Sequence, residues 1–399
     1  MVTFISFLLV TLAGLLAIPV AIFFIEVVAA IVLPDRDCSV PPNKAPHRRI
    51  AVLVPAHNES TGVLPTIADI KAQICAGDRL LVVADNCSDD TATVAAAAGA
   101  DVIERNEPDR KGKGYALAWG IRHLDQDPPD IVIIVDADCR LPDNAISKLA
   151  ATCAVTNRPV QSLNTMIMQD ESPLDTRVNE FAWRVKNYVR PRGLSNLGLP
   201  CQLMGTGMAF PWALIRTANL ASGSIVEDLK LGLELAEAGH SPVFCPLAGV
   251  VSDFPFTVAG LQSQRLRWEQ GHISSIVTLV PRLFFLAVTR ANLGLLALVL
   301  DLVVPPLASL GMLVMGMSVV ASLATLLGIS SAAMLVSSAS LVGLIGTIFV
   351  SWLKYGREIL PSVSILLMFS YVLEKIPLYR KILSRKSSSQ WIRTDRTKM

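Results

Sequence analysis

The chain has 399 residues, of which 52% are hydrophobic and 17% are charged, and its formal net charge is +2. Soluble domains carry about 25% charged residues, so this composition excludes a wholly soluble protein and indicates segments that face lipid. The near-neutral charge argues against a nucleic-acid partner, which requires a basic domain or stripe.

The first apolar run, from Phe4 to Leu33, contains one charge, Glu26, and exceeds the roughly 20 residues that cross a bilayer. No basic residue precedes it, and it is too long for the apolar region of a cleaved signal peptide. We therefore expect a transmembrane helix within residues 1–35. Basic residues follow this helix, so the positive-inside rule places the next region in the cytoplasm.

Residues 48–275 alternate short apolar runs with helical patterns. The predicted strands and helices cover residues 50–54, 61–75, 80–84, 89–98, 114–123 and 131–135. This alternation predicts an α/β domain with a mainly parallel sheet and helices on both faces.

Polar groups follow each predicted strand. Any one of these groups could be a helix cap or a turn, but ligands of open α/β sheets bind at the carboxyl ends of the strands. A shared ligand therefore explains all of them better. The groups are Pro55, His57 and Glu59 after the first strand, Asp85 after the second, and Asp136 and Asp138 after the third.

The positions of glycine residues limit which nucleotide-binding motifs the chain can contain. The segment after the first strand has no glycine, which excludes the GxGxxG turn of dinucleotide folds. The segment 111–114 contains two glycines but lacks the Walker spacing. Lys113 could approach a nucleotide or phosphate there, or could belong to a solvated basic turn.

Three carboxylates point to group transfer. Asp136 and Asp138 offer the oxygen ligands that Mg²⁺ or Mn²⁺ prefers when it binds a diphosphate. Asp228 is the candidate base for removing a proton from an acceptor hydroxyl. On local sequence alone, the favoured interpretation is instead that Glu227 and Asp228 are acids that stabilise the dipole at the start of a helix.

A polar and aromatic cluster ends this region. Guanidinium groups suit pyrophosphate oxygens and an indole suits a sugar ring, although an anchoring helix at the membrane interface has similar residues. The cluster consists of Gln264, Arg265, Arg267 and Trp268.

The remaining chain returns to the membrane. We expect an interfacial helix over 276–292 and two transmembrane helices over 293–353. Asp301, the only charge between residues 293 and 353, could mark a functional kink or could reach the headgroups. Residues 354–399 are expected to hold a short membrane or re-entrant segment, over 359–373, and a basic cytoplasmic tail.

Four of these motifs, in this order, resemble family-2 glycosyltransferases over about residues 48 to 275. They are Asp85–Asp90, Asp136–Asp138, Glu227–Asp228 and Gln264–Trp268. They are most similar to the membrane branch that contains cellulose, chitin, hyaluronan and poly-N-acetylglucosamine synthases and ceramide glucosyltransferase. The resemblance implies a GT-A (Rossmann-like) fold, a nucleotide-sugar donor that is usually a UDP-sugar, and inversion at the anomeric carbon.

The resemblance also implies roles for individual residues. Asp85 would bind uracil and Lys113 the nucleotide, while Asp136 and Asp138 would hold the diphosphate and metal and Asp228 would be the base. Gln264, Arg267 and Trp268 would close over the pyrophosphate, and Gly205, Thr206 and Gly207 would face the acceptor. We also place Pro55, His57, Glu59, Glu227 and Arg265 among the substrate-binding residues. The chain departs from the family pattern at Asn86 and Val226.

The sequence thus predicts an inverting glycosyltransferase in the plasma membrane, with a cytoplasmic catalytic domain and a role in cell-surface polysaccharide synthesis. Its partners would be a nucleotide-sugar donor, a glycan or lipid acceptor and membrane lipids. Transfer of a single sugar to ceramide or a polyprenol-linked lipid is an alternative. A non-catalytic membrane sensor of nucleotide sugars is an alternative from another class.

Overall fold

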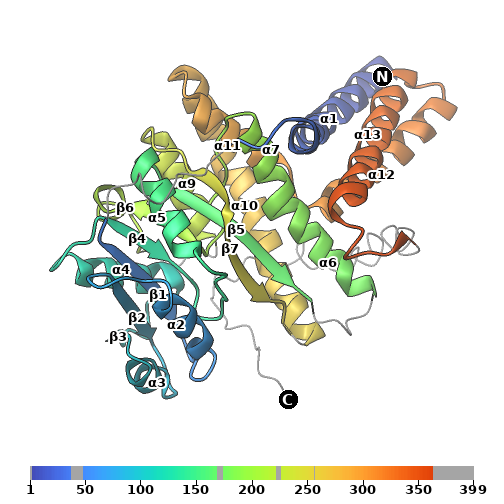
Figure 1. Ribbon diagram of the computed structural model, residues 1–399. Coiled ribbons are helices and arrows are strands. Elements are labelled where there is room, and N and C mark those ends of the chain that lie inside the picture. Colours follow the sequence, from blue (N-terminus) through green and yellow to red (C-terminus); the bar gives the residue numbers. More distant parts are fainter. Residues whose placement is uncertain (1, 37–47, 169–173, 222–225, 256, 363–399) are drawn as a thin grey trace.

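The computed structural model combines a mixed α/β domain with a group of long apolar helices (Figure 1). It describes residues 2–36, 48–168, 174–221, 226–255 and 257–362. The predicted basic tail and most of the predicted membrane or re-entrant segment over 359–373 lie outside these residues.

The α/β domain is built on one seven-stranded sheet. In space the strands follow the order β3-β2-β1-β4-β6-β5-β7. The four strands β3, β2, β1 and β4 run parallel to one another. Strand β6 is antiparallel to both β4 and β5. The predicted mainly parallel sheet is therefore confirmed. The strands are β1 Ile50–Ala56, β2 Arg79–Asp85, β3 Asp101–Arg105, β4 Ile131–Ile134, β5 Val160–Ile167, β6 Met208–Pro211 and β7 Val243–Asp253.

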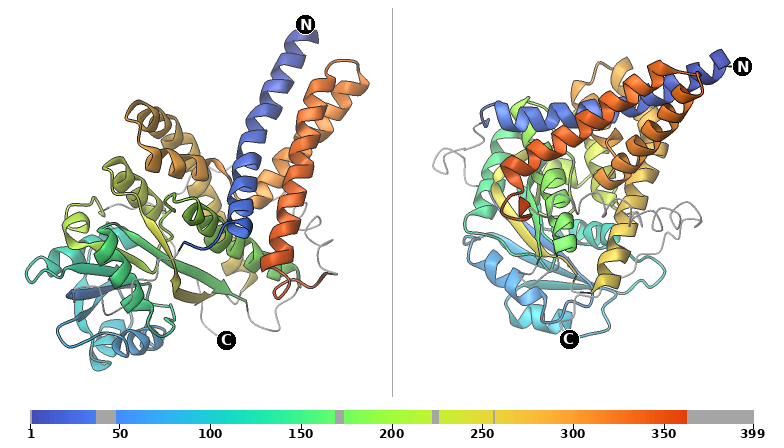
Figure 2. Two further views of the ribbon diagram at one scale, coloured as in Figure 1. Left: turned by 45° about the horizontal axis from the view of Figure 1, so that its top comes forward. Right: turned by 90° about the vertical axis from the view of Figure 1, so that its right-hand side faces the viewer.

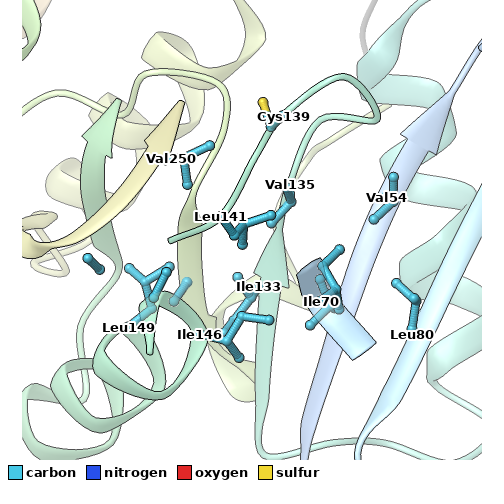
Figure 3. Packing of buried hydrophobic residues seen from close by; sticks show 14 of the residues in the cluster. Val54, Ile70, Leu80, Ile133, Val135, Cys139, Leu141, Ile146, Leu149 and Val250 are labelled. Atoms are coloured by element: carbon cyan, nitrogen blue, oxygen red, sulfur yellow. The ribbon is translucent and has the colours of Figure 1, made fainter. Parts of the chain in front are cut away.

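Helices cover both faces of this sheet, because successive side chains of a strand point to opposite faces. Val52 and Val54 of β1 join one buried cluster, while Ala51 and Leu53 join another. Figure 3 shows the first cluster, where Ile70 and Leu149 meet the strands. Burial on both faces accounts for the continuous apolar runs in the sequence. The helices of this domain are α2 Val63–Lys71, α3 Thr91–Ala97, α4 Lys113–Leu124, α5 Ala145–Thr156, α8 Trp212–Ile215 and α9 Glu227–Glu237.

A helical segment connects the sheet to the apolar helices. It consists of α6 Leu174–Arg184, the π-helical turn η2 Val185–Val189 and α7 Arg190–Asn196. Single π turns within α-helices are rare and occur often at functional sites.

Three long helices stand away from the sheet as a bundle (Figure 2). They are α1 Val2–Val32, α12 Leu307–Leu326 and α13 Ser331–Tyr355, and they share a buried apolar cluster with η2. Their outer faces carry exposed apolar side chains, including Phe4 and Phe7 of α1. By length and composition, four described helices can cross a membrane: these three and residues Gly260–Thr289 of α10.

Helix α10, Val258–Thr289, is continuous through most of the predicted interfacial segment 276–292. It forms a hairpin with α11, Leu293–Val303, and both pack on α9 of the sheet domain. With 11 residues, α11 is shorter than the roughly 20 residues of a spanning helix. The block 293–353 therefore contains a short helix before its two long ones, and the interfacial position of the hairpin stays a prediction.

Candidate active site

A cavity of about 270 Å³ lies between the end of β4, the loop before β6, and helices η2, α7, α9 and α10. Residues far apart in the sequence meet here because strand ends and helix starts converge on one edge of the sheet. Ten residues predicted from the sequence line it: Lys113, Asp136, Asp138, Gly205, Thr206, Glu227, Asp228, Gln264, Arg267 and Trp268.

The loop after β4 holds the first pair of carboxylates in place. The backbone N–H of Asp136 donates a hydrogen bond of 3.0 Å to the Thr206 hydroxyl. On the other side, Thr66 Oγ1 lies 2.8 Å and 2.7 Å from the carbonyl oxygens of Ala137 and Cys139. Contacts from α2 and from the loop before β6 therefore fix the direction in which Asp136 and Asp138 leave the backbone.

These two carboxylates fit a divalent metal ion. One ligand atom each of Asp136, Asp138 and Cys139 lies within 4.8 Å of the others. Burial raises the pKa of the Cys139 thiol to about 12, and its sulfur contacts the Thr206 hydroxyl at 3.4 Å. Because Mg²⁺ and Mn²⁺ prefer oxygen ligands, the two carboxylates suit such an ion and the protonated thiol does not.

Lys113 begins α4 and reaches across the cavity. Its ammonium group donates hydrogen bonds to Asp136 Oδ1 and, at 2.7 Å, to the carbonyl oxygen of Gly205. Burial lowers the pKa of Lys113, but the carboxylates of Asp136 and Glu227 outweigh this effect and raise it overall. Lys113 therefore carries a stable positive charge beside the candidate metal site.

The loop before β6 approaches the acids closely because it contains glycines. Gly205 has a φ of +90°, and a Cβ there would lie 3.3 Å from Asp228 Oδ2 and 3.8 Å from Lys113 Nζ. At Gly207, with a φ of +64°, a Cβ would lie 1.9 Å from Ser162 Oγ. A side chain at Gly205 would occupy the space into which Asp228 and Lys113 converge.

Glu227 and Asp228 begin α9 and face the same cavity. Burial raises the pKa of both carboxyl groups, and the charges of Lys113 and Lys186 oppose this rise at Asp228. A carboxylate with a raised pKa accepts a proton more readily than an exposed one, which suits a general base.

Helix α10 presents three of its predicted residues to the cavity. Gln264, Arg267 and Trp268 are three and four residues apart and so share one helix face. The Trp268 ring packs against Trp183 with a centroid distance of 4.9 Å. Arg265 lies outside this cavity, because its guanidinium contacts Asn179 and, at 3.3 Å, Glu269. Its predicted place in the substrate site stays a prediction.

The cavity also has a wall of residues that sequence reasoning missed. Trp183, Lys186, Asn187 and Arg190 come from α6, η2 and α7. The one available signal was their dense mixture of aromatic and polar groups, similar to that of Gln264–Trp268.

Arg190 links this wall to the apolar helices α1 and α11. Its guanidinium donates hydrogen bonds of 2.6 Å to Glu26 of α1 and to Asp301 of α11. All three side chains are buried. Asp301 therefore lies buried in the cavity wall, paired with Arg190.

The site residues predicted at the ends of β1 and β2 lie outside the cavity lining. His57 Nδ1 lies 2.6 Å from the carbonyl oxygen of Asp85, and the Asp85 carboxylate pairs with Arg105. The backbone N–H of Glu59 donates to the Thr91 hydroxyl at 2.9 Å. Pro55 lies within β1. The role of these residues in binding a nucleotide base stays a prediction.

A family model described as Glycosyltransferase like family 2 matches residues 46–271, more than half of the chain. The chain belongs to this glycosyltransferase family. The matched residues include the loop after β4, the acids of α9 and the first half of α10, so this cavity is the candidate active site of a family-2 glycosyltransferase. The predicted place in the cellulose and chitin synthase branch stays a prediction.

Individual glycosyltransferases resemble the chain in part or throughout. Uncharacterized glycosyltransferases of Mycobacterium bovis and Mycobacterium tuberculosis are each 40% identical over 102 residues, which are 26% of this chain and 42% of theirs. The match thus spans about two fifths of the length of these relatives. The mannosyltransferase PcManGT from Pyrobaculum calidifontis, solved with GDP-Man and Mn²⁺, has a TM-score of 0.55 and 16% identity, covering 94% of this chain and 95% of its own. The two proteins therefore share their fold, a GT-A domain with additional helices, over nearly the whole chain.

Proposed function

We propose that the protein transfers a sugar from a nucleoside-diphosphate donor to a membrane-associated acceptor, with inversion at the anomeric carbon. The observation that carries this proposal is the convergence of Asp228 with Asp136 and Asp138 in one cavity. Such a transfer needs a carboxylate that accepts a proton as a base and a pair of carboxylates that binds a metal ion.

The charges of the cavity support a diphosphate donor. Asp136 and Asp138 would hold Mg²⁺ or Mn²⁺, which neutralises the negative charge on a departing diphosphate. Lys113 and Arg267 add positive charge on either side. A UDP-sugar follows from the motif resemblance, and the GDP-Man bound by the Pyrobaculum protein makes GDP-sugars the first competitors.

Asp228 would act on the acceptor. The acceptor oxygen forms a bond to the anomeric carbon as the bond to the diphosphate breaks, and Asp228 takes the hydroxyl proton. The glycine at position 205 leaves room for the acceptor beside this carboxylate. Trp268 and Trp183 offer flat aromatic surfaces that suit a sugar ring.

The membrane helices support a place at a bilayer. Helices α1, α12 and α13 form an apolar bundle beside the cavity, and basic residues follow α1. We infer from the positive-inside rule that the catalytic domain faces the cytoplasm and that the bundle anchors it in the plasma membrane. The acceptor is then either a growing cell-surface glycan or a lipid.

Replacing Asp228 by Asn tests the proposal, because the amide keeps the shape of the side chain and removes its basicity. We expect nucleotide release from a panel of UDP- and GDP-sugars to fall by about 10² to 10⁴, with donor binding retained. Glu234→Gln, which changes a half-buried acid of the same helix outside the cavity lining, is the matched control and should keep full turnover. Unchanged turnover in Asp228→Asn would remove Asp228 as the base, and donor binding without turnover in the wild type would favour a sensor.

A further inference from the structure

A second cavity, of about 230 Å³, lies between α6, α10, α12 and α13. Its walls are almost wholly apolar, and they include Phe181, Leu344, Ile348 and Trp352. Three of the four helices that form it, α10, α12 and α13, are long and apolar enough to span a membrane. Hydrocarbon is the ligand that such walls accept without leaving polar groups unpaired. We refer to this space as the apolar cavity.

A third cavity, of about 120 Å³, lies between the apolar cavity and the active site. It shares Trp183, Trp268 and Gln264 with the active site. It shares Arg265, Glu269 and Pro306 with the apolar cavity. The three cavities therefore form a row that begins at the catalytic carboxylates and ends among the membrane helices.

Polar atoms without hydrogen-bond partners mark the inner part of this row. Neither amide atom of Asn187 has a partner among the described residues, and neither does Gln264 Oε1 or Glu269 Oε2. Asn187 is 1% exposed, Gln264 5% and Glu269 6%. A buried polar group without a partner costs about 1–3 kcal/mol. The π turn places Asn187 in the active-site wall, where a ligand with hydroxyl groups would satisfy its amide.

We propose that the acceptor is a lipid alcohol whose hydroxyl-bearing head lies beside Asp228 and whose hydrocarbon chain lies in the apolar cavity. Asn187 and Gln264 would bind the head, and the Trp183–Trp268 pair would border the path of the chain. A glycan does not fit this arrangement, because its hydroxyl groups would find no partners on the apolar walls. This inference rests on the proposed function and selects the lipid from its two acceptor classes.

Transfer to a lipid alcohol forms one bond at the anomeric carbon and breaks another. The lipid oxygen forms the new bond to the anomeric carbon, the bond from that carbon to the diphosphate breaks, and the hydroxyl proton passes to Asp228. The products are a glycosylated lipid and a nucleoside diphosphate. The apolar product leaves along the row towards the membrane, and the nucleotide leaves through the cavity mouth at the sheet edge.

The test uses the full chain in lipid nanodiscs and a hexadecanol that carries a photoreactive diazirine near the end of its chain. Ala308, a half-buried residue of the apolar cavity, is replaced by Trp to fill the space. Leu323→Trp, on the exposed side of the same helix, is the matched control. Labelled peptides are mapped by mass spectrometry, and nucleotide release is measured in parallel.

We expect labels on the α12 and α13 residues that line the apolar cavity. Ala308→Trp should reduce them about tenfold, a loss of about 1.4 kcal/mol in binding, because the indole occupies the space that the hydrocarbon chain would fill, while Leu323→Trp should leave them unchanged. Sugar transfer to the lipid should fall with the labels in Ala308→Trp, whereas slow hydrolysis of the donor by water should persist.

Three results would overturn the inference: labels spread evenly over the lipid-exposed faces of α1, α12 and α13, labels in Ala308→Trp equal to those of the wild type, or sugar transfer to soluble oligosaccharides that Ala308→Trp leaves intact. Failure of the proposed function gives a different pattern. In that case the wild type releases no nucleotide from any donor, whatever the labelling shows.

Discussion

The buried ion pairs of Arg190 predict a large loss of stability when this residue is replaced by Met. Arg190 is 7% exposed and neutralises Glu26, which is 1% exposed, and Asp301, which is 7% exposed. Met keeps much of the volume and removes the charge. Two carboxylates then remain buried without a cation in contact, and one oxygen of Glu26 already lacks a hydrogen-bond partner within the described residues.

Breaking a buried ion pair by removing one partner costs roughly 3–5 kcal/mol. We expect Arg190→Met to lower the apparent free energy of unfolding in detergent by this amount, because the substitution removes the cation that pairs with both Glu26 and Asp301. The measurement is denaturant-induced unfolding followed by tryptophan fluorescence, since Trp183 and Trp268 lie beside Arg190 in the cavity wall. Arg49→Met, which breaks an exposed ion pair with Asp127, is the control and should show no measurable change.

A triple variant separates charge from packing. Combining Arg190→Met with Glu26→Gln and Asp301→Asn removes all three charges while keeping the shapes of the side chains. Because neutral groups cost less to bury, most of the lost stability should return. The reasoning is refuted if Arg190→Met unfolds within about 1 kcal/mol of the wild type, or if the triple variant is no more stable than the single one.

Three further predictions concern packing, the metal loop and pH. Gly193→Ala should destabilise the protein by roughly 1–3 kcal/mol, because its Cβ would lie 1.9 Å from the carbonyl oxygen of Glu26. Gly14→Ala, whose Cβ would meet no described atom within 4 Å, should not change stability, and equal unfolding midpoints for the two variants would contradict this prediction. Thr206→Val removes the acceptor of the Asp136 N–H and should raise the metal concentration needed for half-maximal turnover several-fold, for a hydrogen bond worth about 1 kcal/mol; an unchanged metal titration would argue against it. Burial raises the pKa of Asp228, and only the deprotonated carboxylate accepts a proton. We therefore expect kcat to fall on acidification with an apparent pKa above the value of about 4 for an exposed aspartate. A kcat that stays constant down to about pH 4 would exclude Asp228 as the base.

The row of three cavities changes the ranking of acceptors given by motifs alone. The sequence motifs occur in both polymerising enzymes and lipid glycosyltransferases, so they leave both acceptors open. The apolar cavity favours a lipid, because its walls come from α6, α10, α12 and α13 and expose almost no polar surface. This discrimination depends on side chains that have no motif of their own.

The sequence by itself determined most of the elements and most of the predicted residues that line the candidate active site. Apolar runs predicted β1, β2 and β4, because a strand buried on both faces needs apolar residues at every position. Strand-end positions predicted Asp136 and Asp138, because parallel strands bring their functional groups to one edge of the sheet. Asp228 followed from the motif resemblance, because its position at a helix start is also explained by the helix dipole. Long runs without charge predicted α1, α12 and α13, because length and hydropathy are local properties.

Only the tertiary structure decided which polar residues share a cavity. Arg265 and Arg267 are two positions apart, yet the helical rotation turns one towards Asn179 and the other towards the active site. Glu26 and Asp301 are single charges in separate apolar runs, and their common partner Arg190 lies more than a hundred residues from either. Such contacts depend on how whole helices dock in space, which no spacing within one segment of the chain records.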